Sequence, residues 1–133
     1  MRQALLLLAV SVAAAVAACP ASASGSTPIV FGITGGNALP YRVTIQPNGT
    51  VRLRGPAWRV RRQIRPAQVR RLRREIQRAH LATSTCTNSL PDFGTRFIRL
   101  GDHRFAVRGE CEVPFNHVFG DLENAVALRA RRG

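Results

Sequence analysis

The fold of this chain is set by residues 65–81, which read RPAQVRRLRREIQRAHL. Pro66 suits the first turn of an α-helix, because the N–H that proline lacks is not needed there. Val69, Leu72, Ile76 and Ala79 then recur at spacings of three and four, so they form one apolar stripe of that helix. The opposite side carries the arginines, namely Arg70, Arg71, Arg73, Arg74 and Arg78. The segment therefore predicts a helix with one face on a sheet and a cationic face in water.

The rest of the chain alternates between apolar and polar residues with the period of β-strands. Strands are expected at residues 29–34, 41–46, 50–54, 96–100 and 104–108, and residues 58–61 are a candidate for one further short strand. Residues 29–34 are apolar on both sides, which is typical of a central strand. Pro114 opens a second helix whose apolar stripe is Phe115, Val118, Phe119, Leu122 and Val126. The pattern predicts an α+β domain, in which an antiparallel sheet of about five strands carries two helices packed on one face.

Alternation along the third and fourth strands also predicts a charged surface. Trp58 and Val60 are expected to point inward, which directs four arginines toward water on the uncovered side of the sheet: Arg52, Arg54, Arg59 and Arg61. Together with three arginines of the helix, Arg70, Arg74 and Arg78, these are the candidate contacts for an anion or a partner.

Composition bounds the class of the protein. The chain has 133 residues and a formal net charge of +13, and all 20 basic residues are arginine. Such a charge attracts acidic polymers, anionic lipid or acidic proteins. The alternative is a coding bias that places arginine wherever a solvated cation is tolerated, and the even spread of the arginines favours that alternative. On the helix, Arg70 and Arg74 repel each other at i and i+4, which favours an acidic partner.

The N-terminus has the features of a secretory signal, which we assign to residues 1–23. Arg2 precedes an apolar run over residues 5–18 that is too short to span a bilayer. Cleavage after Ala23 would release a free chain, whereas lipidation of Cys19 would anchor it to a membrane. Residues 24–28 form a short tether, residues 29–128 the domain, and residues 129–133 a basic tail. We expect the protein in the cell envelope or secreted, with no transmembrane span.

The cysteine count agrees with export. Without Cys19, the chain keeps Cys86 and Cys111, an even pair suited to an oxidising compartment. A disulfide between them would stabilise a small domain by roughly 3 kcal/mol.

Residues for catalysis are scarce. His117 and Asp121 stand at i and i+4, a spacing suited to a metal or an acid–base pair, but the sequence identifies no third ligand. Metalloprotease, nucleotide-binding and nucleophile-elbow motifs are absent. We therefore expect no catalytic residues, no metal, no cofactor and no enzymatic activity. Nucleic acid is also not expected as a partner, because stacking aromatics are few.

Several short motifs resemble a known family. Ile33-Thr34-Gly35-Gly36 ends the first strand, Ala79-His80-Leu81 ends the helix, and Pro91-Asp92 precedes the second hairpin. This order resembles the emfourin-like family of small bacterial inhibitors of thermolysin-type metalloproteases. The resemblance implies an α+β inhibitor domain with a protease partner. Ile33 stands where the family has arginine, and we transfer no contact residue.

Two functions follow as predictions. The first is an exported non-enzymatic binding domain of the protease-inhibitor kind. The second is a cationic surface protein that binds acidic polymers or anionic envelope lipids.

Overall fold

The structure is a computed structural model that describes residues 27–90 and 92–131. The signal segment, Cys19 and most of the tether lie outside the described residues. Within the described part, no helix has the length and the apolar character needed to cross a bilayer.

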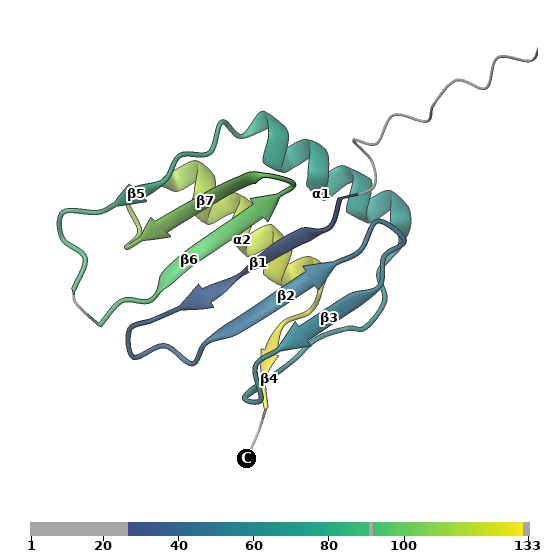
Figure 1. Cartoon of the computed structure of the whole chain (residues 1–133), viewed down its shortest axis with the longest axis horizontal. Helices are drawn as coiled ribbons and strands as arrows, with labels where there is room; N and C mark the ends of the chain where they lie inside the picture. Colours follow the sequence, from purple (N-terminus) through teal and green to yellow (C-terminus); the bar gives the residue numbers. More distant parts are fainter. Residues whose placement is uncertain (1–26, 91, 132–133) are drawn as a thin grey trace, which may run out of the picture.

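Two helices and two sheets make up the fold (Figure 1). The strands are β1 (Ile29–Thr34), β2 (Tyr41–Ile45), β3 (Val51–Arg54), β4 (Trp58–Arg59), β5 (Ser84–Thr85), β6 (Thr95–Leu100), β7 (His103–Arg108) and β8 (Arg129–Ala130). The helices are α1 (Pro66–Arg78) and α2 (Val113–Ala125). The larger sheet has six strands in the order β3-β2-β1-β6-β7-β5, and β4 and β8 form a separate pair.

The α+β class is confirmed, but the sheet is larger than predicted and it is mixed. All pairings in the six-stranded sheet are antiparallel except that of β5, which runs parallel to β7. β5 holds only Ser84 and Thr85, inside a segment whose turn-forming composition predicts a loop. A strand of two residues is too short to show an alternating pattern, so the sequence gives no signal for it.

β1 occupies the centre of the sheet, as its apolar sequence predicts, with β2 on one side and β6 on the other. Phe31 lies between Val43 and Ile98, which fixes the register of all three strands. The glycine of this strand is required by packing: a Cβ at Gly32 would lie 2.1 Å from the carbonyl oxygen of Tyr41. A side chain at that position would force β1 and β2 apart.

Both helices cover the same face of the sheet (Figure 1). Val69, Leu72 and Ile76 of α1 are buried, as are the predicted stripe residues of α2. They pack on the inward residues of the strands, and Phe119 meets the ring of Phe31 edge to face at 5.7 Å. The predicted two-layer arrangement is therefore correct.

Trp58 and Val60 pack against the core and Arg59 and Arg61 are exposed, as predicted, but their strand is not part of the six-stranded sheet. Arg59 belongs to β4, which pairs with β8, and the backbone N–H of Arg61 donates to the carbonyl of Val126, so neither residue extends the six-stranded sheet. The chain meets the start of β3 again at Arg62, whose carbonyl accepts a hydrogen bond from the N–H of Val51. Arg73 is also not on the solvent side of α1: it is 8% exposed and donates hydrogen bonds to Thr27. The predicted basic tail, residues 129–133, also differs from the structure, because Arg129 and Ala130 form strand β8.

The two layers are connected at both ends. Cys86, beside β5, forms the predicted disulfide with Cys111, which precedes α2, and their Cα atoms are 5.7 Å apart. At the opposite end of α2, the Tyr41 hydroxyl donates a 2.5 Å hydrogen bond to Glu123 Oε1. Burial and this carboxylate raise the pKa of Tyr41 well above its usual value, so the phenol stays a donor.

Candidate functional site

The face of the sheet that the helices leave uncovered carries five exposed arginines, and we call it the open face. They are Arg42, Arg52, Arg54, Arg99 and Arg104. Strand register places them in two rows. One row runs Arg52, Thr44, Val30, Arg99, Arg104, and the other runs Arg54, Arg42, Gly32, Phe97, Ala106. Each row crosses five strands, and neighbouring strands are about 4.8 Å apart.

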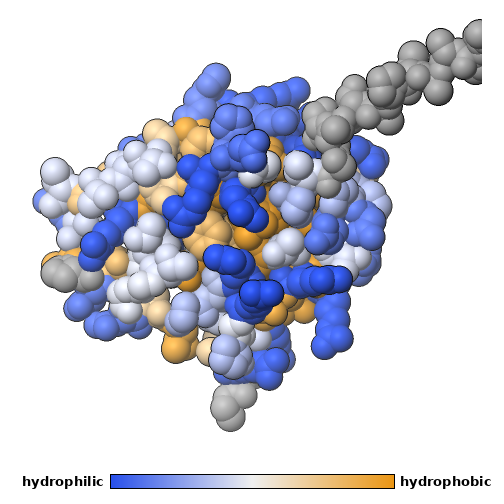
Figure 2. Space-filling model, in the orientation of Figure 1, coloured by the Kyte–Doolittle hydropathy of each residue, from blue (hydrophilic) through white to orange (hydrophobic). Residues whose placement is uncertain are grey.

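The centre of the open face is apolar, but arginines cover it. Val30 and Phe97 are 5% and 3% exposed, yet they lie outside the core cluster beneath the helices. The guanidinium carbon of Arg104 lies 4.9 Å from the centroid of the Phe97 ring, and that of Arg42 lies 5.7 Å from it. Figure 2 shows this face, with hydrophilic side chains around and over a central apolar area. Phe97 therefore holds two guanidinium groups by cation–π contact.

Like charges face each other directly on this surface. Arg42 pairs with Arg54 across β2 and β3, and Arg99 pairs with Arg104 across β6 and β7. None of the seven acidic residues of the chain belongs to a strand of this sheet, and in the described residues none of the five arginines forms an ion pair with a carboxylate. Like charges in directly opposite positions destabilise a sheet. The open face is therefore built at a cost to stability.

The sequence identifies part of this surface. Arg52 and Arg54 lie on the open face as predicted, whereas Arg70, Arg74 and Arg78 lie on the far side of the molecule, on the exposed side of α1. Arg42, Arg99 and Arg104 are missing from the predicted set. In each strand, the side chains of these arginines point to the face opposite the core residues. The alternation of apolar and polar residues in 41–46 and 96–108 indicates this orientation.

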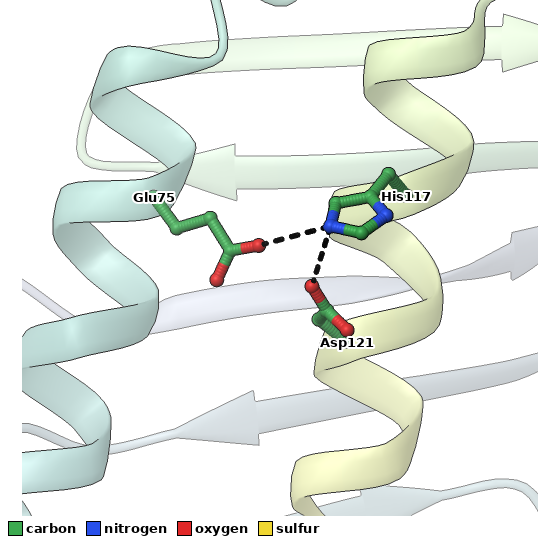
Figure 3. A group of neighbouring side chains, drawn as sticks. All are labelled: Glu75, His117 and Asp121. Atoms are coloured by element: carbon green, nitrogen blue, oxygen red, sulfur yellow. Dashed lines mark ion pairs between the residues drawn. The ribbon is translucent and has the colours of Figure 1, made fainter.

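The helix side holds a different arrangement, between α1 and α2. His117 Nε2 lies 3.3 Å from Asp121 Oδ2 and 4.0 Å from Glu75 Oε1 (Figure 3). Glu75 is the third group that the sequence does not identify, because it comes from the other helix. Burial and the neighbouring carboxyl of Asp121 raise the pKa of Glu75. A hollow of about 670 Å³ adjoins Glu75 and His117 and is also lined by Arg71, Arg74 and Arg78.

The other two histidines of the chain lie elsewhere. His80, which has a positive φ of 48°, and His103 line a separate hollow with Asp102 near the end of α1. They are therefore not part of the Glu75–His117–Asp121 cluster.

One end of the sheet brings together two loops from distant parts of the sequence. The N–H of Asn37 donates to the carbonyl of Asp92 at 3.0 Å, and the backbone of residues 92–94 lies against Gly36. Leu90 and Phe93 of the second loop are 62% and 44% exposed. Cys86, which begins this loop, is held by the disulfide. The loop therefore presents two large apolar side chains on an anchored backbone.

No protein-family model, no curated protein and no solved structure matches this chain.

Proposed function

We propose that this chain is an exported, non-enzymatic binding protein that holds an acidic polymer on its open face. The pairing of Arg42 with Arg54 and of Arg99 with Arg104 carries the proposal. Each pair places two cations opposite one another without a carboxylate between them, which costs up to about 1 kcal/mol per pair. An anion bound across a pair removes this repulsion, so the cost is recovered when the ligand binds.

The spacing of the arginines suits a ligand with repeated negative charges. Arg52 and Arg99 are three strands apart in one row, which corresponds to about 14 Å, and Arg104 is one strand further. Guanidinium groups bind phosphate, sulfate and carboxylate through paired N–H donors. Because Phe97 orients Arg42 and Arg104, part of the binding surface is ordered before the ligand arrives.

Burial of the apolar centre favours a polymer over a lipid bilayer as the ligand. Surfaces that enter a bilayer combine cations with exposed apolar side chains. On the open face the large apolar residues, Val30 and Phe97, are almost completely covered. Attraction of the arginines to anionic lipid would therefore not be reinforced by insertion of apolar side chains into the bilayer.

Two matched triple variants test the proposal. Arg52→Gln/Arg54→Gln/Arg99→Gln removes three charges from the open face, and Arg70→Gln/Arg74→Gln/Arg78→Gln removes three charges from α1. The full chain is expressed with its own N-terminus and purified from the exported fraction, and binding to heparin and to polyglutamate is measured by titration over a series of salt concentrations. We expect the open-face variant to lose at least about tenfold in affinity and the α1 variant to lose much less.

Equal losses in the two variants would contradict the proposal, because binding that depends only on net charge does not distinguish the two faces. Vesicles of phosphatidylglycerol form a second arm of the experiment. Binding to vesicles that is tighter than binding to the polymers, and that is lost in the open-face variant, would assign the surface to lipid instead.

Protease inhibition is the second candidate function. The two loops that meet at Asn37 and Asp92 include residues of the motifs that resemble the emfourin-like family. Leu90 and Phe93 are exposed there, as two large apolar side chains that a partner could bury. A rigid loop that places such a side chain in a protease pocket is a common basis of inhibition.

The chain is therefore tested at stoichiometric amounts against a thermolysin-type protease, together with Leu90→Ser and Phe93→Ser. Slower hydrolysis with the wild-type chain, and loss of the effect in these variants, is the expected result. Unchanged hydrolysis at micromolar concentrations of the chain would remove this candidate and leave the open face unaffected.

A further inference from the structure

A small cluster of ligand-forming side chains connects the two helices on the side of the molecule away from the open face. Glu75 is the contribution of α1, and His117 and Asp121 come from successive turns of α2. One ligand atom from each residue lies within 4.8 Å of the other two (Figure 3). The three residues remain accessible to an ion from solution, since their side chains are 26%, 75% and 34% exposed in that order.

We propose that Glu75, His117 and Asp121 form a binding site for a divalent transition-metal ion, with Zn²⁺ as the best representative. An imidazole nitrogen with two carboxylate oxygens is a ligand set that suits Zn²⁺. Bonds of about 2.0–2.2 Å to such an ion need ligand atoms about 3.3–3.6 Å apart. His117 and Asp121 already have this separation, at 3.3 Å, and Glu75 has to approach His117 by about half an ångström from 4.0 Å.

The electrostatics of the cluster also favour a cation. Glu75 and Asp121 are neighbouring carboxylates that repel each other when both are ionised. A protonated His117 relieves this repulsion in part, and a divalent ion that replaces the proton relieves it more strongly. Because the ion binds the neutral imidazole, a proton and the ion compete for the same nitrogen of His117.

Nearby arginines limit the affinity. Arg71, Arg74 and Arg78 line the hollow beside the cluster and repel a cation. With three protein ligands and these charges close by, we expect micromolar rather than nanomolar binding, with water or an anion at the remaining coordination position. The ion would join α1 to α2 directly and so stabilise the helix layer.

The test uses the full chain, freed of metal by a chelator and titrated with ZnCl₂ by calorimetry and by thermal unfolding. We expect one ion per chain, a rise in the midpoint of unfolding, and affinity at least about tenfold higher than for Mg²⁺, since imidazole favours Zn²⁺. His117→Ala and Asp121→Asn should each weaken Zn²⁺ binding at least about tenfold. Glu75→Gln should weaken it as well and should leave the fold intact.

The matched control is His80→Ala/His103→Ala, which removes the two histidines outside the cluster and should leave the affinity for Zn²⁺ unchanged. Co²⁺ in place of Zn²⁺ gives an absorption spectrum that reports the ligands directly, and loss of His117 should change it. Retained affinity in His117→Ala, loss in the control, or no saturable binding below about 1 mM would overturn the proposal.

Discussion

The two sides of this molecule are both rich in arginine, but they are built in different ways. On the open face, strand register fixes five exposed arginines in two rows, and two of them lie over Phe97. On the helix side, arginines of α1 share the surface with two carboxylates and a histidine. The proposed polymer site therefore lies on one side of the molecule, and the proposed metal site lies on the other.

Net charge alone therefore does not describe the surface of this basic protein. The sequence has 20 basic and seven acidic residues, and the fold distributes the acidic ones unequally. Glu75, Asp121 and Glu123 all belong to the helices, whereas none belongs to the six strands of the sheet. Field strength above each side depends on this distribution rather than on the sum.

The largest effect on this two-sided structure should come from separating the layers. In Cys86→Ala/Cys111→Ala, the far edge of the sheet is no longer joined to the start of α2. A disulfide that closes a loop with a sequence separation of 25 stabilises a domain by about 3 kcal/mol. We expect a loss of that size in the free energy of unfolding, measured with urea. Similar stability of the variant and of the oxidised wild type would contradict it.

Removal of the support beneath the arginines should have the next largest effect. In Phe97→Ala, a ring that is 3% exposed is lost, and Arg42 and Arg104 no longer have the surface on which they lie. We expect a loss of about 2 kcal/mol, less than for a phenylalanine of the main core, because water can enter the space from the open face. Polymer binding should weaken too. Phe97→Leu serves as control and should retain most of the stability.

A smaller effect is expected from the polar contact between the layers. In Tyr41→Phe, Glu123 loses a hydrogen bond of 2.5 Å that joins β2 to α2. Hydrogen bonds to charged groups contribute about 1.5–3 kcal/mol, and partial exposure of the carboxylate to water places the expected loss near the lower limit. Urea unfolding at neutral pH measures it. Binding of acidic polymers should not change, because Tyr41 faces the helices.

The smallest effect concerns the pH dependence of the helix side. The pKa of Glu75 is raised above 4.5 in the folded chain, so folding favours its protonated form. The stability of the wild type relative to Glu75→Gln should therefore fall as pH rises from about 4.5 through the raised pKa. Unfolding curves of both chains at pH 4 and pH 7 measure the difference. A relative stability that rises with pH would show that Arg71 dominates instead.

Much of the fold was predictable because it depends on local patterns. The spacing of Val69, Leu72 and Ile76 predicts the buried side of α1, and the uniformly apolar sequence of residues 29–34 predicts a central strand. The features of the fold that the sequence did not predict depend on contacts between distant segments. β5 is too short for a pattern, and the pairing of β4 with the C-terminal β8 has no local signal.

For the candidate sites as well, the sequence predicts the features that depend on local patterns and misses those that depend on distant contacts. Alternation predicts Arg52 and Arg54 on the open face, and the same alternation holds for Arg42, Arg99 and Arg104, which the predicted set omits. The burial of Arg73 has a different origin: the chain before β1 passes beside α1 and supplies Thr27 as an acceptor. Periodicity along one helix contains no information about such a neighbour.

By itself, the sequence determined the two apolar helix stripes, the alternating strands and the excess of arginine, because each of these follows from residues close together in the chain. Which arginines share a surface, and that Glu75 lies beside His117 and Asp121, depends on how the strands and helices pack together. The physical reason is that strand order and helix packing bring distant residues within a few ångströms, where charge repulsion, cation–π contact and metal ligation take effect.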